Sequence, residues 1–252
     1  MWSNTVISLR HAGLVAVLFV LAVSMLGAQE SDPFSRLSSA HIFGTGTSVE
    51  AAADLQIFEA SGQTTRGIEL YLQREGSLRT RMLAQVVSPA FLRNLKLLTI
   101  TEGANSTTWM KTSQGTRRLG SGGGDQAVFS SHFRAGDFEN LNREDYRFAF
   151  VPDMRSAPSN TAIEAEDFRN ESLRRVYEID SATGSFVRIR YFDDSELVRE
   201  YQVLEFGSFD GATVPARARM DDYRAGGHTI LVVQEYDADA RIPARMFNPA
   251  SL

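Results

Sequence analysis

The chain has 252 residues, of which 26 are Lys or Arg and 31 are Asp or Glu, and it contains no Cys. This mildly acidic balance argues against a nucleic-acid partner, because such proteins present a basic patch to the phosphate backbone. Without Cys the chain can form no disulfide and no lipid anchor at a cysteine, so its core alone must stabilise the fold.

The N-terminal segment is typical of a secretory signal. Arg10 precedes the apolar run Gly13–Leu26, and the small residues Gly27 and Ala28 offer a cleavage site. The run of about 14 residues is short of the roughly 20 that span a bilayer, so we favour export with cleavage over a permanent anchor. Residues 1–28 are therefore predicted to be a signal peptide, and residues 29–252 a single domain with a net charge of 25 − 31 = −6.

The first part of the mature chain predicts little regular structure. Asp32–Thr47 is polar and irregular. Ser48–Leu55 (SVEAAADL) carries Ala and Glu at good helix-forming positions, and Thr47 or Ser48 could serve as its N-cap. We therefore expect one or two helical turns here.

From Leu55 onward the pattern changes to short runs of alternating apolar and polar residues, separated by Gly, Pro, Asn, Asp and Ser. Such runs are typical of strands joined by tight turns. The predicted strands are Thr65–Arg74, Leu78–Val87, Leu95–Thr101, Thr107–Lys111, Tyr146–Phe150, Ala162–Phe168, Arg174–Asp180, Ser185–Phe192, Leu197–Phe206, Thr213–Asp222 and His228–Tyr236.

The regular spacing of these runs predicts a mainly β fold. A single antiparallel sheet, strongly curled into an incomplete barrel with short helices as plug or lid, fits best, and a sandwich is the alternative. A curled sheet with few helices to fill it would leave an apolar cavity, the usual form of a site for lipophilic ligands. The predicted cavity lining is Leu70, Met82, Leu97, Trp109, Phe148 and Ile189. The alternative is that these residues are ordinary core.

No motif in the chain supports catalysis or metal binding. His41, His132 and His228 are far apart in sequence and lack Cys neighbours, so a zinc site is not expected. The Gly-rich stretch Gly120–Gly124 lacks the Lys-Ser/Thr of a phosphate-binding loop, and there is no G-x-S-x-G elbow. We therefore expect a binding protein without a cofactor rather than an enzyme.

The stretch Met82–Leu141 combines the features that could shape a binding surface. It contains a Trp-bearing strand, the pair Arg117 and Arg118, the flexible Gly120–Gly124 loop, and an acidic helix start at Asp137. The Arg pair could meet a polar headgroup or simply be solvated, and both alternatives remain open.

These residues resemble a known family, the LolA-like outer-membrane lipoprotein-sorting proteins, and within it the spirochaete-type branch. The resemblance covers roughly Leu55–Leu252. Asn94 replaces the family's usual Gly, and the helix start reads Ala135-Gly136-Asp137 instead of a tighter acidic pattern. The matching positions are Pro89, Leu97, Leu98, Trp109, Arg117, Arg118, Gly136, Asp137, Phe138 and Leu141, then Tyr201, Gly211, Val214, Pro215, Met220, Asp221, Thr229, Tyr236, Phe247 and Leu252.

The resemblance implies an incomplete β-barrel whose cavity holds acyl chains and whose mouth is covered by helices. The implied role is a monomeric periplasmic carrier of lipoproteins or related lipids, which exchanges cargo with an inner-membrane exporter and an outer-membrane acceptor. Asp137, Phe138 and Leu141, together with the Gly120–Gly124 loop, would form the lid. The alternatives are a periplasmic envelope-stress sensor of the RseB-like kind on the same fold, and a structural envelope protein with a filled core.

Overall fold

Thirteen strands form one antiparallel sheet in the described part of the computed structural model, in the spatial order β6-β5-β4-β3-β2-β1-β13-β12-β11-β10-β9-β8-β7. The structure describes residues 32–40, 42–43, 46–76, 79–103, 105–119, 123–138 and 141–252, so the predicted signal peptide lies outside the described residues. The strands are β1 Ser48–Glu59, β2 Gly62–Glu75, β3 Arg79–Ser88, β4 Lys96–Glu102, β5 Asn105–Thr112, β6 Gly115–Arg118, β7 Tyr146–Phe150, β8 Asn160–Asp167, β9 Leu173–Asp180, β10 Phe186–Asp193, β11 Glu196–Phe209, β12 Ala212–Asp222 and β13 His228–Asp237.

The helices in the described part of the chain are short. The helix α2 spans Pro33–Ser38, and the other helical elements described are single 3-10 turns. These are η1 Ala90–Leu92, η2 Gly123–Asp125, η3 Ala135–Phe138, η4 Pro152–Met154, η5 Ala244–Phe247 and η6 Pro249–Ser251. None of the helices in the described part of the chain is long and apolar enough to cross a membrane.

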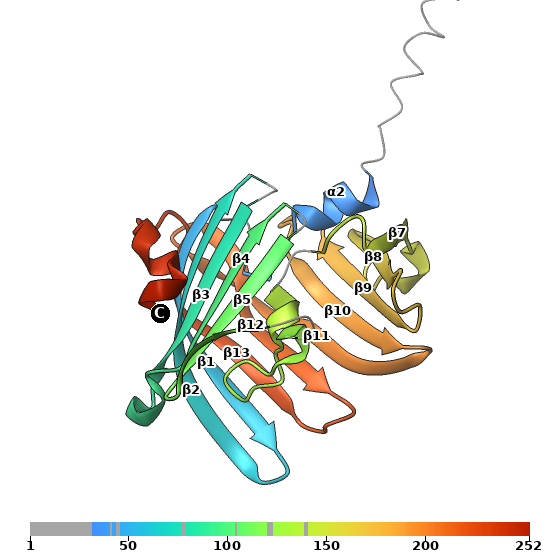
Figure 1. Ribbon diagram of the computed structural model, residues 1–252. Helices are drawn as coiled ribbons and strands as arrows, with labels where there is room; N and C mark the ends of the chain where they lie inside the picture. Colours follow the sequence, from blue (N-terminus) through green and yellow to red (C-terminus); the bar gives the residue numbers. More distant parts are fainter. Residues whose placement is uncertain are drawn as a thin grey trace, which may run out of the picture. The chain divides into compact units, whose positions relative to one another are not determined.

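The sheet curls but does not close, as Figure 1 shows. The chain makes two meanders, β1–β6 and β7–β13, which are joined where β1 pairs with β13. The edge strands β6 and β7 do not pair with each other. The prediction of a single curled antiparallel sheet forming an incomplete barrel is therefore confirmed.

This topology determines where one connection must run. Residues 119–145, which we call the crossing segment, leave β6 at one edge of the sheet and enter β7 at the other edge. The segment therefore has to cross the open side of the sheet, and its described part lies inside the curl in Figure 1. Its aromatic residue Phe133 is buried in the same cluster as the inner face of the strands.

The predicted helix over Ser48–Leu55 is wrong, because these residues begin strand β1. Val49, Ala51, Ala53, Leu55 and Ile57 are all buried and alternate with less buried residues, and β1 pairs with β2 on one side and β13 on the other. Helix propensities differ by less than about 1 kcal/mol per residue, so pairing and burial on both sides override them. The stretch predicted to be irregular contains helix α2, and the exposed strand β6 was not predicted.

Two apolar clusters lie on opposite faces of the sheet. The larger fills the concave side and contains Leu70, Met82, Leu97 and Ile189. The smaller lies on the outer face of β3–β5, where Leu83, Leu98 and Trp109 pack against Ile242 and Phe247 of the C-terminal tail, residues 240–252. Both faces of this half of the sheet are therefore covered.

Candidate binding cavity

The main cavity lies between the inner face of the sheet, helix α2 and the crossing segment, and it has a volume of about 90 Å³. Two smaller voids of about 20 and 10 Å³ adjoin the same core and share Phe43 in their lining. Sites for drug-sized ligands usually measure roughly 300–1,000 Å³. The interior is therefore largely filled in this conformation. The main lining residues are Phe34, Leu37, Ala40, Ile42, Phe43, Leu72, Arg74, Met82, Asp137, Phe138, Leu141, Arg175, Tyr177, Phe186, Ile189 and Tyr191.

An aromatic plug, which we define as Phe43, Phe133 and Phe138, occupies the space inside the curl. The rings of Phe43 and Phe138 stack with centroids 5.8 Å apart, and those of Phe133 and Phe138 lie 5.9 Å apart. Phe133 also contacts the buried Tyr201 of β11, at 6.3 Å between centroids. Two of the three rings come from the crossing segment, so this segment supplies much of the interior.

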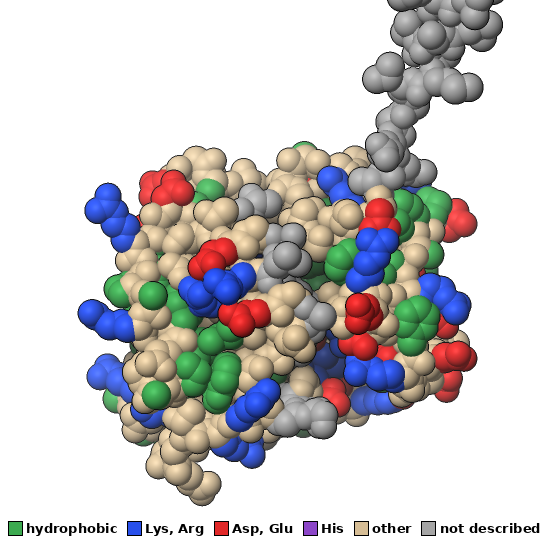
Figure 2. All heavy atoms as spheres, turned by 45° about the horizontal axis from the view of Figure 1, so that its top comes forward, with side chains coloured by type: hydrophobic (Ala, Val, Ile, Leu, Met, Phe, Trp, Pro, Cys, Tyr) green, Lys and Arg blue, Asp and Glu red, His purple; other side chains and the backbone are tan. Residues whose placement is uncertain are grey.

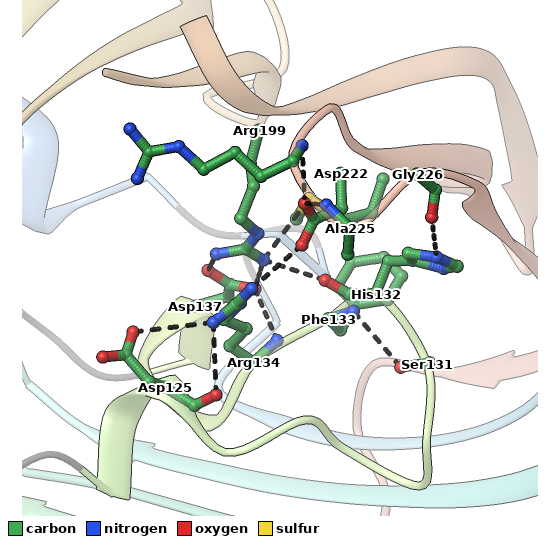
Figure 3. A network of polar contacts seen from close by, with 12 residues as sticks. Asp125, Ser131, His132, Phe133, Arg134, Asp137, Arg199, Asp222, Ala225 and Gly226 are labelled. Atoms are coloured by element: carbon green, nitrogen blue, oxygen red, sulfur yellow. Dashed lines mark hydrogen bonds and ion pairs between the residues drawn. The ribbon is translucent and has the colours of Figure 1, made fainter. Parts of the chain in front are cut away.

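Buried ion pairs fasten the crossing segment to the sheet, as Figure 3 shows. Arg199 of β11 donates to Asp137, with 2.5 Å between Nη2 and Oδ2, and to the carbonyl of His132 at 2.9 Å. The side chains of Arg199 and Asp137 are only 10% and 2% exposed. Burial disfavours the charge of Arg199, but Asp137 outweighs this effect and raises the pKa of Arg199 above its ordinary value.

A second ion pair lies beside the first. Arg134 donates to Asp222 at the end of β12, with 2.9 Å between Nη2 and Oδ2. Burial alone would raise the pKa of Asp222, but hydrogen bonds from the Ala225 amide and from Arg134 lower it below its ordinary value. Asp222 is therefore ionised at neutral pH.

His132 ties the crossing segment to β13. Its amide donates to Oγ1 of Thr229 at 3.0 Å, and its Nδ1 lies 2.8 Å from the same oxygen. A side chain at Gly227 would collide here, since an added Cβ would lie 2.4 Å from the carbonyl of Phe58 and 3.0 Å from Nε2 of His132. The β12–β13 turn and the crossing segment therefore fit together closely.

The structure places four of the six predicted lining residues together on the inner face. Met82 and Ile189 line the main cavity, while Leu70, Leu97 and Met82 line an adjoining void. Phe148 is half-buried at the margin of the core, where its ring lies 5.2 Å from that of Phe34.

Trp109 lies on the opposite face from the cavity, contrary to the predicted lining. Its register partner in β4 is Leu98, and both belong to the outer cluster beneath the C-terminal tail. Its neighbours Thr108 and Met110 face inward instead. Because side chains alternate along a strand, a single register position decides between the two faces.

The predicted headgroup residues Arg117 and Arg118 are exposed on the edge strand β6, and neither lines the main cavity. They donate to Gln126 at 3.3 Å and to Thr107 at 3.2 Å. This position fits the solvated alternative better than contact with a headgroup.

The predicted lid residues Asp137, Phe138 and Leu141 all line the main cavity. The expected helix start is a 3-10 turn, Ala135–Phe138, and residues 139–140 lie outside the described part of the chain. In the Gly-rich loop, residues 120–122 also lie outside it, and Gly123–Asp125 forms another 3-10 turn.

Sequence reasoning missed the polar residues of the site, Arg199, Arg134, Asp222 and Arg175. Their positions in predicted strands and turns carried no signal, because their partners are distant in sequence, as with Arg199 and Asp137. Among the described residues, no group of three or more His, Asp or Glu side chains could hold a metal ion.

A family model described as "Uncharacterized protein" matches residues 79–252. The chain belongs to this family. Solved structures share its fold, among them the following three. A DUF1329 family protein from Desulfovibrio piger matches with a TM-score of 0.70 and 17% identity, covering 82% of this chain and 92% of that one. No curated protein matches the chain in sequence.

The other two structures carry the lipoprotein-sorting description. A putative outer membrane lipoprotein-sorting protein domain from Vibrio parahaemolyticus has a TM-score of 0.73, 16% identity, and coverage of 86% and 94% of the two chains. A LolA superfamily protein from Nitrosomonas europaea has a TM-score of 0.62, 13% identity, and coverage of 87% and 97%. At these identities the likeness concerns the fold, so the LolA-like fold that the resemblance implied is confirmed.

Proposed function

We propose that the protein is a periplasmic carrier that binds the acyl chains of lipoproteins or related lipids and moves them toward the outer membrane. This proposal rests on how the inner face of the sheet is covered. The apolar concave side of an unclosed sheet is covered by a connecting segment instead of by a second sheet. Such a cover can be displaced without unpairing any strand.

The physical need for such a carrier follows from the cost of exposing lipid to water. Each buried methylene contributes about 0.8 kcal/mol, so acyl chains do not cross an aqueous gap unaided. A carrier must shield the chains and still release them. The cavity of about 90 Å³ is too small for a full acyl chain, so the structure corresponds to a closed conformation in this proposal.

Opening would move the crossing segment away from the sheet. Asp137, Phe138 and Leu141 act as the lid in this scheme, and withdrawal of Phe138 from Phe43 would join the main cavity to the adjoining void, which both rings line. The ion pair of Arg199 with Asp137 would hold the lid closed until cargo binds.

We further propose two partner proteins, one in each membrane. A monomeric carrier would exchange cargo with an inner-membrane exporter and an outer-membrane acceptor, and it needs no cofactor and no catalytic group. On the face drawn in Figure 2, Lys and Arg side chains are interspersed with Asp and Glu, so this face presents no large basic field to nucleic acid.

A disulfide across the lid tests the proposal. The double substitution His132→Cys and Thr229→Cys places a Cys pair at two residues that are already in contact, with 3.0 Å between the amide nitrogen of His132 and Oγ1 of Thr229. The chain has no native Cys that could compete for the disulfide. We expect the oxidised variant to take up a fluorescent fatty acid at least about tenfold more slowly than its reduced form, which is the matched control. Equal uptake rates of the oxidised and reduced forms would exclude the proposal that the crossing segment acts as a lid.

Identifying the molecules that the protein binds in its native envelope distinguishes the carrier from the alternative functions. Mass spectrometry of the protein purified from its host should detect acyl lipid or lipoprotein. A stoichiometric signalling partner with no bound lipid would favour the envelope-stress sensor. Protein that carries neither, and that ignores the fatty-acid probe, would favour the structural role.

A further inference from the structure

Arg175 of β9 lies where the main cavity meets a charged groove. The groove has a volume of about 310 Å³, and among the described residues Arg175 and Tyr191 line both it and the cavity. A ligand with one polar end and one apolar end could therefore contact Arg175 from the groove and the apolar lining from the cavity. The groove is lined by Asp125, Arg134, Tyr146, Asp167, Leu173, Arg174, Arg175, Tyr191, Phe192, Asp193, Val198, Arg199, Asp222 and Arg224.

Strand register forms a polar row across the inner face. Arg175 of β9 pairs with Tyr191 of β10, Tyr191 pairs with Arg199 of β11, and Arg199 pairs with Asp222 of β12. The guanidinium carbons of Arg175 and Arg199 lie 5.5 and 4.7 Å from the centre of the Tyr191 ring. The position of Arg175 is thus determined by the sheet and not by a loop.

The other four arginines of the groove have carboxylate partners. Their shortest ion pairs measure 2.5–2.9 Å: Arg134 with Asp222, Arg174 with Glu164, Arg199 with Asp137, and Arg224 with Asp193. Among the described residues, no carboxylate forms an ion pair with Arg175. Arg175 donates a long hydrogen bond, with 3.5 Å between its Nη1 and the phenol oxygen of Tyr177.

The surrounding phenols do not neutralise this charge. Tyr177 and Tyr191 are 6% and 7% exposed, and burial raises the pKa of both above its ordinary value. Both phenols are therefore neutral at physiological pH and can donate a hydrogen bond to an anion. A partly buried cation without a counter-ion is costly, and a bound anion would remove that cost.

We propose that Arg175 binds the anionic headgroup, carboxylate or phosphate, of a single-chain amphiphile whose alkyl chain enters the main cavity in its open conformation. The planar guanidinium suits two-point binding of either group. The alkyl chain would contact Leu72, Met82 and Ile189, which line the cavity beside it. Asp137, the carboxylate in the same cavity, is paired with Arg199 and does not repel the headgroup. This inference rests on the proposed lipid-binding function and specifies its ligand.

Matched ten-carbon ligands test the proposal by calorimetry. Decanoate and decyl phosphate carry an anionic head, while decanol has the same chain with a neutral head. We expect the wild type to bind at least one of the two anions about 10- to 100-fold more tightly than decanol, the range that one charge-assisted hydrogen-bonded contact provides. Arg175→Met should reduce this ratio to about 1 while decanol affinity changes little.

Arg147→Met is the matched control, because Arg147 of β7 pairs with Glu166 and lines neither the groove nor the main cavity. It should leave the anion preference unchanged. Thermal unfolding of both variants reports whether they fold.

The outcomes separate the two proposals. Equal binding of all three ligands by the wild type would overturn the role of Arg175 and leave the carrier intact. Binding of none would overturn the carrier itself. If acetate or inorganic phosphate competed as well as the ten-carbon anions, the site would be one for free anions and the amphiphile would be excluded.

Discussion

Two segments cover the same sheet, and they do so by different chemistry. The C-terminal tail, residues 240–252, packs on the outer face through apolar contacts of Ile242, Phe247 and Leu252 with Leu98 and Trp109. The crossing segment covers the inner face with its aromatic residues and is fastened by buried ion pairs. Apolar burial does not depend on the ionisation of side chains, whereas ion pairs weaken with added salt and with protonation, so the inner cover is the one suited to opening.

Removing an apolar anchor of the tail should have the largest effect. Phe247 is 4% exposed, and Phe247→Ala should lower the free energy of unfolding by about 3–5 kcal/mol, through lost burial and a residual cavity. Urea unfolding measures this loss. Phe91→Ala is the control, since Phe91 is 82% exposed and its removal should change stability by less than about 0.5 kcal/mol. A loss below that value for Phe247→Ala would mean that the tail is not an anchored part of the fold.

Breaking the ion pair that holds the crossing segment on the sheet should have a smaller effect on stability, and it should also change the rate of ligand uptake. Asp137→Asn leaves the buried Arg199 without a charged partner, which should cost about 2–3 kcal/mol. Uptake of a fluorescent fatty acid should become faster in this variant. Phe247→Ala, compared under conditions where both variants are fully folded, should leave the uptake rate near that of wild type. Similar uptake rates in the two variants would remove the distinction between the covers.

Acid should loosen the inner cover before the outer one. The pKa of Asp222 is lowered in the folded protein, so its ionisation stabilises the fold above the unfolded pKa of about 3.9 and this contribution is lost as pH falls through the folded value. Hydrogen exchange of residues 125–138 should therefore accelerate below about pH 4, relative to residues 240–252. Asp222→Asn should flatten this dependence. An equal acceleration of both segments would show that acid unfolds the protein globally.

The smallest effect expected is spectroscopic. The chain has two Trp residues, and Trp109 is the one outside the predicted signal peptide. Because Trp109 contacts the tail cluster on the outer face, deleting residues 240–252 should shift its emission to longer wavelength. Binding of decanoate should leave the emission almost unchanged. If ligand binding shifted the emission of Trp109 as far as the deletion does, the inner and outer faces of the sheet would be structurally coupled.

The sequence predicted the strands best where one face is apolar and the other polar. Tyr146–Phe150 was located to the residue, and the predicted strand Thr65–Arg74 lies within β2. The prediction failed at β1, where Ala and Glu favour a helix in isolation but both edges of the strand pair with neighbours. Local preference is weak compared with burial, so such a segment cannot be assigned without its partners.

The sequence by itself determined the class of this protein. Alternation with a period of two, interrupted by turn residues, is a local property, and it indicated a curled sheet with an apolar face. Only the tertiary structure decided which residues form the site. Trp109 faces outward, where the tail covers it. Asp137 pairs with Arg199, which is 62 residues away along the chain. Arg175 lies beside Tyr191 and has no carboxylate partner among the described residues. Pairing between distant residues leaves no local pattern, since it depends on how the chain crosses the open side of the sheet.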